Sequence, residues 1–413
     1  SESSMMSLAK ADPLAADTPF LGLAPFLRAS IAGQDLRALG QEMLTLAGER
    51  GDDANLWMNL SLAMQCVGQR DLGLAIQAQA LVMRRIYALP AAIQPARACV
   101  LMLMVPGDLA ANTPLECLLE DSDIDLVYYY VTPGDPLALP IPEHDVLLVA
   151  LGDSEENRPL LATLEAVLAD WPKPVVNAPQ FIPATDRSIA SALLGDAPGV
   201  LIPPTLYVAR EVLGEIARGD ARLADLVEGC DFPIILRPVG SQAGRELEKF
   251  DRPEEIVPYL ERVADAEFFL SRFIDYCGAD GLFRKYRIAM IDGEPFACHM
   301  GVSSHWMVHY VNAGMYEDAA KREEEARFME NFADFAARHR AALAAIHERN
   351  RLDYICIDCA ETADGRLLIF EADHCMVVHA MDPEDLFPYK RVHMQKVKNA
   401  FREFLFRLKA AQS

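Results

Sequence analysis

Long apolar runs are absent from this chain of 413 residues. The longest run, from Ala98 to Val105, is far shorter than the roughly 20 residues that an α-helix needs to cross a bilayer. The N-terminus also lacks a basic stretch followed by an apolar one, so we expect neither a membrane segment nor a secretion signal. The expected location is therefore the cytoplasm.

Positive charge is scarce as well. The chain has 38 lysines and arginines against 61 aspartates and glutamates, which gives a formal net charge of −23. This charge repels nucleic-acid phosphates and anionic lipid heads, so we expect no nucleic-acid partner and no membrane partner. The 9 cysteines are an odd number scattered over a long chain, which is typical of reduced thiols rather than of a disulfide framework.

Three common nucleotide-binding motifs are also missing. The sequence contains no GxGxxG fingerprint, no Walker GxxxxGK[ST] loop and no protein-kinase catalytic loop, which excludes those phosphate-binding designs. The chain does contain 52% hydrophobic residues, enough for a sizeable core and, at this length, for two or three domains.

The pattern of apolar residues divides the chain into four parts. Residues 1–18 are predicted to be a disordered lead, residues 19–95 a helical domain, residues 96–182 a small parallel α/β domain, and residues 183–413 a second α/β region with antiparallel sheets. The last part is expected to form a first lobe over 183–266 and a second lobe with a C-terminal helix over 267–413. The predicted fold class is therefore mixed, with α+β and α/β parts.

The helical domain has apolar residues at spacings of three and four, with turns at Gly33, Gly51 and Gly68. We predict four helices there. The segment from Trp57 to Pro90 resembles one tetratricopeptide unit, although no second copy can be aligned. The alternative is a helical packing domain without a peptide groove.

Two turns in the last third of the chain, at residues 291–294 and 362–365, each join two apolar runs and predict β-hairpins. One charged helix is predicted between the hairpins, over residues 316–350. An amphipathic helix over residues 390–411 is predicted to close the chain.

Three acidic residues belong to the second predicted hairpin. Asp358 lies in its first strand, and Glu371 and Asp373 end the partner strand on one face. Facing like charges destabilise a sheet unless a positive charge lies between them. Carboxylate oxygens favour magnesium, so this triplet predicts a metal site. The alternative is a solvated polar face at the end of a strand.

Basic residues collect in one stretch of this acidic chain. Between Phe232 and Met300 it carries Arg237, Arg245, Lys249, Arg252, Arg262, Arg272, Arg284, Lys285 and Arg287. Arg237 ends a predicted strand, and Gly240 and Gly244 follow in a turn whose backbone amides can cradle phosphate oxygens. With the acidic triplet, this stretch predicts a site for a magnesium nucleotide.

These residues together resemble the ATP-grasp superfamily of carboxylate–amine ligases over residues 97–385. Asp358, Glu371 and Asp373 reproduce the spacing of that family's metal ligands, in which a glutamate follows an aspartate by 13 residues and an asparagine follows two later. The resemblance makes 96–182 a pre-ATP-grasp domain and 183–413 the ATP-grasp domain. The segment 283–310 also resembles a subgroup in which tetratricopeptide-like helices precede this unit.

The resemblance implies a role for each matching residue. The implied nucleotide-binding residues are Arg187, Arg237, Gly240, Ser241, Gly244, Ser271, Arg272, Phe273, Ile274 and Phe370. The implied catalytic cations, which face the terminal phosphate, are Arg284, Lys285 and Arg287. The implied cofactors are ATP and Mg²⁺, with two metal ions expected and Mn²⁺ as an alternative metal.

Five of the 9 histidines fall in two short segments near these residues. The candidate substrate-binding residues there are His299, His305, His309, Tyr310 and His379. His374, next to Asp373, is the preferred catalytic histidine, because imidazole can act as a general base near neutral pH. The alternative is that these rings only pack within loops.

Two positions depart from the family pattern. Asp373 replaces the asparagine and adds a negative charge, and Cys356 stands where some peptide-forming members have an arginine, whose duty would pass to Arg284, Lys285 or Arg287. Cys356 and Cys359 have CxxC spacing, but no second pair of ligands completes a zinc site.

The function implied by the resemblance is an ADP-forming ligase. ATP would phosphorylate a carboxylate to an acyl phosphate, which an amine or a similar nucleophile then attacks. The carboxylate and nucleophile are unidentified, with an amino acid or a peptide as candidates, and a homodimer is one open arrangement. Two alternatives remain, an ATP-grasp kinase that phosphorylates a hydroxyl, and a helical-repeat adaptor that binds nucleotide without turnover.

Overall fold

The computed structural model describes residue 14, residues 18–241 and residues 243–412. The disordered lead predicted for residues 1–18 lies, apart from Leu14 and Thr18, outside the described residues. The chain forms two compact units: unit 1 holds residues 1–182, 352–355 and 373–413, and unit 2 holds residues 183–351 and 356–372. None of the helices in the described part combines the length and the apolar character that a bilayer crossing requires.

Between residues 18 and 90, which the structure describes, unit 1 has four helices, the number that the sequence predicts for this segment. They are α2 (Ala24–Ile31), α3 (Leu36–Glu49), α4 (Ala54–Cys66) and α5 (Arg70–Met83). Asp35 and Asp53 cap α3 and α4, because each side chain accepts a hydrogen bond from a backbone amide of the first turn. These helices surround α4, whose residues are nearly all buried.

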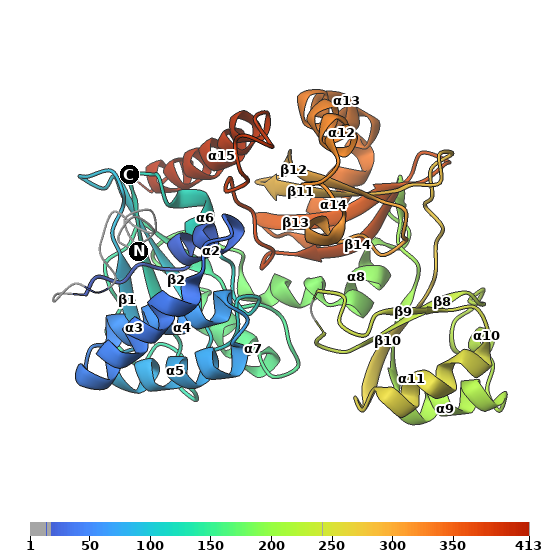
Figure 1. Ribbon diagram of the computed structural model, residues 1–413, viewed down its shortest axis with the longest axis horizontal. Coiled ribbons are helices and arrows are strands. Elements are labelled where there is room, and N and C mark those ends of the chain that lie inside the picture. Colours follow the sequence, from blue (N-terminus) through green and yellow to red (C-terminus); the bar gives the residue numbers. More distant parts are fainter. Residues whose placement is uncertain (1–13, 15–17, 242, 413) are drawn as a thin grey trace. The chain divides into compact units, whose positions relative to one another are not determined.

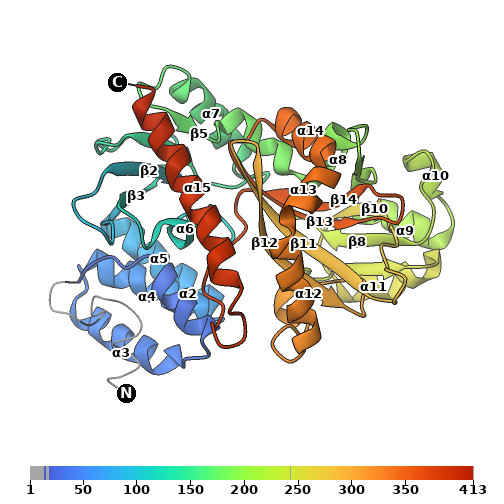
Figure 2. The ribbon, with the colours of Figure 1, turned by 90° about the horizontal axis from the view of Figure 1, so that it is seen from above.

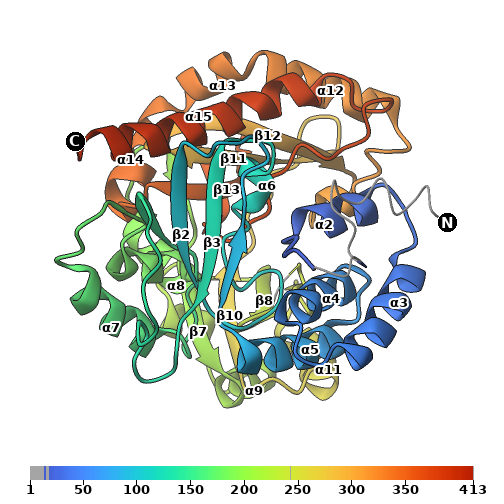
Figure 3. The same ribbon diagram turned by 90° about the vertical axis from the view of Figure 1, so that its left-hand side faces the viewer.

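A five-stranded sheet forms the rest of the unit 1 core, in the order β1-β3-β2-β4-β5. The strands are β1 (Ile86–Leu89), β2 (Ala98–Met104), β3 (Ile124–Tyr130), β4 (Val146–Val149) and β5 (Val175–Val176). The predicted parallel sheet is confirmed, since β2 to β5 pair in parallel and β2 and β3 lie side by side (Figure 3). Strand β1 is an antiparallel edge strand in the segment predicted to be helical.

The helices α6 (Glu116–Leu119), α7 (Arg158–Leu168) and α15 (Lys390–Ala410) complete unit 1. Helix α15 contacts α6, β2 and β4, and its long axis can be followed in Figure 2. The contacts therefore group α15 with the first unit, whereas the sequence grouped it with the last predicted domain. A 3₁₀ segment, η1 (Pro179–Thr185), spans the boundary at residue 182.

The first sheet of unit 2 is antiparallel, in the order β7-β10-β8-β9. Strands β8, β9 and β10 are labelled in Figure 1. Its strands are β7 (Thr205–Ala209), β8 (Ile234–Pro238), β9 (Glu248–Phe250) and β10 (Glu267–Arg272). The helices α9 (Arg210–Arg218), α10 (Leu223–Leu226) and α11 (Ile256–Arg262), with η2 (Pro253–Glu255), belong to the same part. Leu213, Leu236, Ile256 and Phe268 form part of the core between helices and sheet.

The second sheet of unit 2 has the order β12-β11-β13-β14-β6. Its strands are β6 (Val200–Leu201), β11 (Phe283–Ile291), β12 (Glu294–Ser303), β13 (Tyr354–Glu361) and β14 (Leu367–Asp373), and the ends of β13 and β14 run into unit 1. Both predicted hairpins are present. Asp292 and Gly293 turn the first with φ values of 50° and 82°, as a two-residue hairpin turn requires.

The single helix predicted for residues 316–350 is wrong. The segment forms α12 (Ala319–Glu330), α13 (Phe332–Arg338) and α14 (Arg340–Asn350). Asn331 and His339 break it, and His339 is buried with its Nε2 atom 2.7 Å from Glu361 Oε2. This contact joins distant parts of the sequence, so local periodicity does not reveal it. The remaining elements of unit 2 are α8 (Arg187–Leu194) and η3 (Tyr310–Asn312).

Candidate functional site

The loop between β8 and β9 contains several residues with left-handed backbone. Gly240 and Gly244 have φ values of 80° and 72°, and Ala243 and Glu246 both have φ of 54°, a left-handed region that side chains disfavour. Such conformations cost about 1–3 kcal/mol each and cluster at functional sites. Loops with left-handed residues are one backbone arrangement that can bind an anion through its amides.

Arg237, near the end of β8, carries a positive charge that no ion pair compensates among the described residues. Its Nε atom is buried and has no hydrogen-bond partner there. Burial and then the charge of Arg187 lower the pKa of Arg237 to about 9, although Glu371 opposes this shift. An unpaired guanidinium beside a glycine loop is arranged to receive an anion.

Two further buried polar atoms along this loop lack a partner among the described residues. They are Ser241 Oγ and His309 Nε2. His309 lies against Gly244, where an added Cβ atom would be only 2.4 Å from Nε2, so glycine is needed there. Burial, Lys285 and Arg237 lower the pKa of His309, which favours the neutral ring. Buried polar groups are nearly always hydrogen-bonded, so these atoms indicate a polar ligand.

Asp358 lies at the centre of an ion cluster on β11 and β13. It is 2% exposed, and Arg287 binds it bidentately, with Nε 2.9 Å from Oδ1 and Nη2 3.1 Å from Oδ2. Lys285 Nζ lies 3.5 Å from Oδ2. Burial opposes ionisation, but the charges of Arg287 and Lys285 outweigh it and hold the pKa of Asp358 below its usual range. The protein itself therefore supplies positive charge where the sequence predicted a metal ion.

Glu371 is paired in a similar way. Arg187 Nη2 lies 3.5 Å from Glu371 Oε1, and Arg187 Nη1 donates to the carbonyl of Phe370 at 2.9 Å. Asp186, the residue before Arg187, caps α8 through hydrogen bonds from Ser188 and Ile189 and so fixes where the helix starts. The cap makes Arg187 the first residue of α8, and from there its side chain reaches Phe370 and Glu371 in β14.

The carboxylates of Asp358 and Glu371 fit a magnesium ion by their chemistry, because oxygen is its preferred ligand. Both oxygens of Asp358 already contact cations, so a metal ion can use them only if those cations move. Asp373 ends β14 and belongs to unit 1, where its Oδ1 accepts a hydrogen bond from Cys375 N at 3.0 Å. Its place in a metal site stays a prediction.

An apolar cluster lies beside these charges in unit 2. Tyr276, Ala360 and Leu368 are buried, and Ile274 and Phe370 pack against them. The Tyr276 and Phe370 rings are 5.0 Å apart. Two residues predicted to hold the adenine base, Ile274 and Phe370, therefore lie together. Tyr276 was missed, although an aromatic residue two positions after Ile274 was a usable signal.

The other residues predicted for the base lie at the end of β10. Ser271 is buried and Arg272 is exposed, as expected for neighbouring residues of a strand. Phe273 follows the strand, and Lys249 Nζ lies 4.6 Å from its ring centre. Trp306 contacts the same ring at 5.6 Å, and its carbonyl accepts a hydrogen bond from Tyr276 Oη.

Arg284 is not brought together with Lys285 and Arg287. Side chains alternate along a strand, so Arg284 faces the other side of β11. There it contacts Asp280, with Nη2 2.6 Å from Oδ2, and also Glu324. The structure thus gathers two of the three predicted cations around Asp358.

The predicted substrate residues of unit 2 are placed differently from one another. His299 lies opposite Arg287 in the β11–β12 register and stacks on Tyr310 with ring centres 4.4 Å apart. Tyr310 Oη donates to the buried Glu325, which the sequence did not single out. His305 is exposed, and its Nδ1 accepts a hydrogen bond from Met307 N. His299 and Tyr310 are therefore the pair nearest the ion cluster by register.

His374 and His379 belong to unit 1. His374 is fully buried, and its Nε2 lies 2.9 Å from the carbonyl oxygen of Leu151. Asp373, His374 and Cys375 hold metal-type ligand atoms within 4.8 Å of one another. His379 Nδ1 accepts a hydrogen bond from Met381 N at 3.0 Å. The burial of His374 favours packing over a catalytic role.

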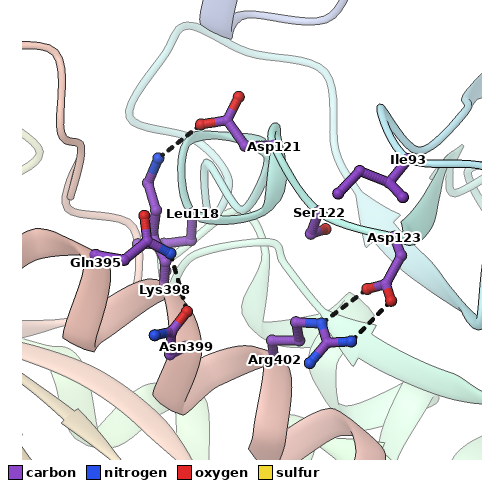
Figure 4. Close-up of a pocket in the computed structure, with 9 residues that line it drawn as sticks. All are labelled: Ile93, Leu118, Asp121, Ser122, Asp123, Gln395, Lys398, Asn399 and Arg402. Carbon is purple, nitrogen blue, oxygen red and sulfur yellow. Dashed lines mark hydrogen bonds and ion pairs between the residues drawn. The ribbon is translucent and has the colours of Figure 1, made fainter.

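A pocket of about 250 Å³ lies within unit 1, beside α15 (Figure 4). Lys398 pairs with Asp121 at 3.2 Å, and Arg402 pairs with Asp123 at 2.7 Å. These pairs balance the charges that line the pocket, in contrast to the uncompensated Arg237. The loop of unit 2 is therefore the stronger candidate site.

Solved structures similar to this chain share little sequence with it. D-alanine–D-alanine ligase from Bacillus anthracis, complexed with ATP, has 14% identity and a TM-score of 0.43, and the match covers 76% of this chain and 99% of that one. VanG D-Ala:D-Ser ligase from Enterococcus faecalis has 14% identity and a TM-score of 0.45, with 77% and 100% covered. A RimK domain ATP-grasp protein from Sphaerobacter thermophilus has 16% identity and a TM-score of 0.41, with 74% and 99% covered. No protein-family model and no curated protein matches the chain.

These neighbours are ATP-grasp ligases, the superfamily that the sequence resembles. The mixed α/β fold with antiparallel sheets is as predicted. The tetratricopeptide-like subgroup is not confirmed. Because each TM-score is below 0.5, the functional proposal rests on the contacts within unit 2.

Proposed function

We propose that unit 2 binds ATP and activates a carboxylate as an acyl phosphate for attack by an amine or a similar nucleophile. The observation that carries the proposal is the uncompensated Arg237 beside a glycine loop with buried, unpartnered polar atoms. A triphosphate would supply the missing negative charge and hydrogen-bond acceptors. The acidic surface of the chain leaves this cluster as a local site for a small anion.

Each part of the site has a role in this proposal. Arg237 with Gly240, Ser241 and Gly244 holds the phosphates, and the cluster of Tyr276 and Phe370 covers the base. Asp358 and Glu371 would hold magnesium, which neutralises charge on the phosphates. The donor chemistry of Asp358 and Glu371 supports this assignment.

The proposed reaction needs alignment and charge more than covalent chemistry. A carboxylate oxygen of the substrate attacks the terminal phosphorus of ATP, and the bond to ADP breaks. The amine then attacks the carbonyl carbon, phosphate leaves, and the nitrogen loses a proton. In this proposal Arg237, Lys285 and Arg287 stabilise the negative charge that develops on oxygen atoms in both steps.

The test uses hydroxylamine as the nucleophile. The whole chain would be incubated with ATP, Mg²⁺, hydroxylamine and a panel of amino acids and short peptides. We expect one carboxylate to yield a hydroxamate with an equal amount of ADP. A stable phosphorylated product instead would contradict the ligase and indicate a kinase. Nucleotide binding without ADP formation on any panel member would indicate the adaptor.

A further inference from the structure

The ion cluster of Asp358, Arg287 and Lys285 has a consequence for how a metal ion enters the site. The three side chains lie on the neighbouring strands β11 and β13. Arg287 and Lys285 are about four-fifths buried, and Asp358 is almost fully buried. In such surroundings charge pairs are screened much less than at the surface. The cluster is therefore a strong electrostatic feature of unit 2.

The arginine and a metal ion compete for the same oxygen atoms. Arg287 uses Nε for Oδ1 and Nη2 for Oδ2, so it engages both oxygens of Asp358. Lys285 adds a second positive charge 3.5 Å from Oδ2. A divalent ion bound there would lie close to two fixed cations, and like charges repel strongly at such distances. Metal binding thus requires Arg287, and to a lesser degree Lys285, to leave Asp358.

Glu371 shows the same arrangement. Arg187 lies 3.5 Å from its Oε1. Both carboxylates that unit 2 would offer to a metal ion are therefore paired with protein cations. Arg237 differs, because it has no carboxylate within ion-pair distance in the described part of the chain and is available to the phosphates from the start.

We propose that Arg287 and Lys285 keep Asp358 closed to metal ions until a nucleotide binds, and that the phosphates then draw both cations away and open the metal site. This inference rests on the proposed function. Its driving force is an exchange of partners, since the cations give up one carboxylate and gain several phosphate oxygens. The register shift between Arg287 and Ile288 supports this role, because β-bulges re-aim side chains near active sites.

The test measures the binding of Mn²⁺ alone, without nucleotide, from the electron paramagnetic resonance signal of the free ion. Wild-type protein is compared with Arg287→Gln. We expect Arg287→Gln to bind Mn²⁺ about tenfold more tightly, because the main competitor for Asp358 is gone. The gain should disappear in the double variant Arg287→Gln/Asp358→Asn, which removes the carboxylate.

Two matched control variants separate the effect of direct contact with Asp358 from the effect of removing a positive charge elsewhere in unit 2. Arg284→Gln removes a cation from the other face of the same strand, where it pairs with Asp280 and Glu324. Arg366→Gln removes an exposed cation that pairs with Asp364, away from Asp358 and Glu371. Both should leave the Mn²⁺ affinity within about twofold of wild type. If either control tightens Mn²⁺ binding as much as Arg287→Gln does, the inference is overturned.

A second variant keeps the inference testable if Arg287→Gln does not fold. Lys285→Met removes the more distant cation and leaves the bidentate pair intact, so Mn²⁺ binding should tighten by about threefold. Unchanged Mn²⁺ affinity in both variants overturns the inference. The proposed function fails separately, through the absence of ADP formation by wild-type protein in the hydroxylamine assay.

Discussion

Individual residues account for the binding chemistry of unit 2. Arg237 supplies a charge that forms no ion pair among the described residues, and Gly244 gives the loop room against His309. Asp358 is held ionised by its neighbours. These three features differ in kind, so each can be tested by a separate substitution.

Arg237→Ala should weaken the binding of a non-hydrolysable ATP analogue by at least about tenfold, because it removes a cation of β8 that forms no ion pair within the described part of the chain. The affinity of Arg237→Lys for the analogue should lie between those of wild type and Arg237→Ala, since lysine keeps the positive charge but lacks the forked N–H donors of arginine. Isothermal titration calorimetry measures both. The control Arg366→Ala removes an exposed arginine directly after the 362–365 turn and should bind the analogue as wild type does. Equal affinity in Arg237→Ala and wild type would contradict the site.

Gly244→Ala should also weaken nucleotide binding. The new methyl group would lie 2.4 Å from His309 Nε2, and the backbone φ of 72° is unfavourable for alanine. Gly365→Ala is a matched control, because that glycine has φ of 84° with no atom within 4 Å of the added group. The double variant Gly244→Ala/His309→Ala should recover part of the affinity. No recovery would mean that backbone strain alone causes the loss.

The pairing of two elements, β11 and β13, makes stability depend on pH. A carboxyl whose pKa is lower in the folded protein stabilises it fully above the unfolded pKa of about 3.9 and loses this contribution as the pH falls through the folded pKa. Asp358→Asn should therefore cost about 3 kcal/mol at pH 7, and the cost should shrink as the pH falls below about 4. Urea unfolding in chelator-containing buffer measures it.

The control for this experiment is Asp225→Asn in α10, which changes an exposed carboxylate. Its effect on the free energy of unfolding should stay below about 0.5 kcal/mol at pH 7 and at pH 3. If Asp358→Asn lowers the free energy of unfolding equally at pH 7 and pH 3, altered packing, and not the lost charge, explains the destabilisation.

Helix α15 should matter for unit 1 stability and not for nucleotide binding. Phe401 is 1% exposed and packs on Tyr354, so Phe401→Ala should destabilise the protein by about 3–5 kcal/mol. Val392→Ala, at a position of the same helix that is 65% exposed, should change stability little. Denaturation and analogue binding would be measured together. A lost affinity in folded Phe401→Ala protein would contradict the grouping of α15 with unit 1.

At the scale of the whole molecule, the sequence predicts the elements whose signals are local. The apolar runs of β2, β3 and β4 predict a buried parallel sheet, and the turns at Gly293 and Gly365 predict two hairpins. Strands as short as β1 and β6 lack such a signal because they depend on partners far along the chain. The break at His339 is missed for the same reason, since Glu361 is its partner.

The candidate site follows the same division. Spacing and residue type single out Asp358, Glu371 and Arg237 from the sequence. Alternation along β11 already implies that Arg284 cannot share a face with Lys285 and Arg287. Which face meets Asp358 depends on the placing of β13 beside β11, two strands that are separated by more than 60 residues in the chain. The ion cluster therefore required the structure.

The central claim is that Arg237 and the loop between β8 and β9 in unit 2 bind a nucleoside triphosphate. Hydrogen–deuterium exchange of the whole chain, with and without a non-hydrolysable ATP analogue and Mg²⁺, tests it most directly. The account predicts slower exchange in the peptides that cover residues 237–249 and 271–276. Unchanged exchange in those peptides, or protection confined to the unit 1 pocket beside Arg402, would contradict it.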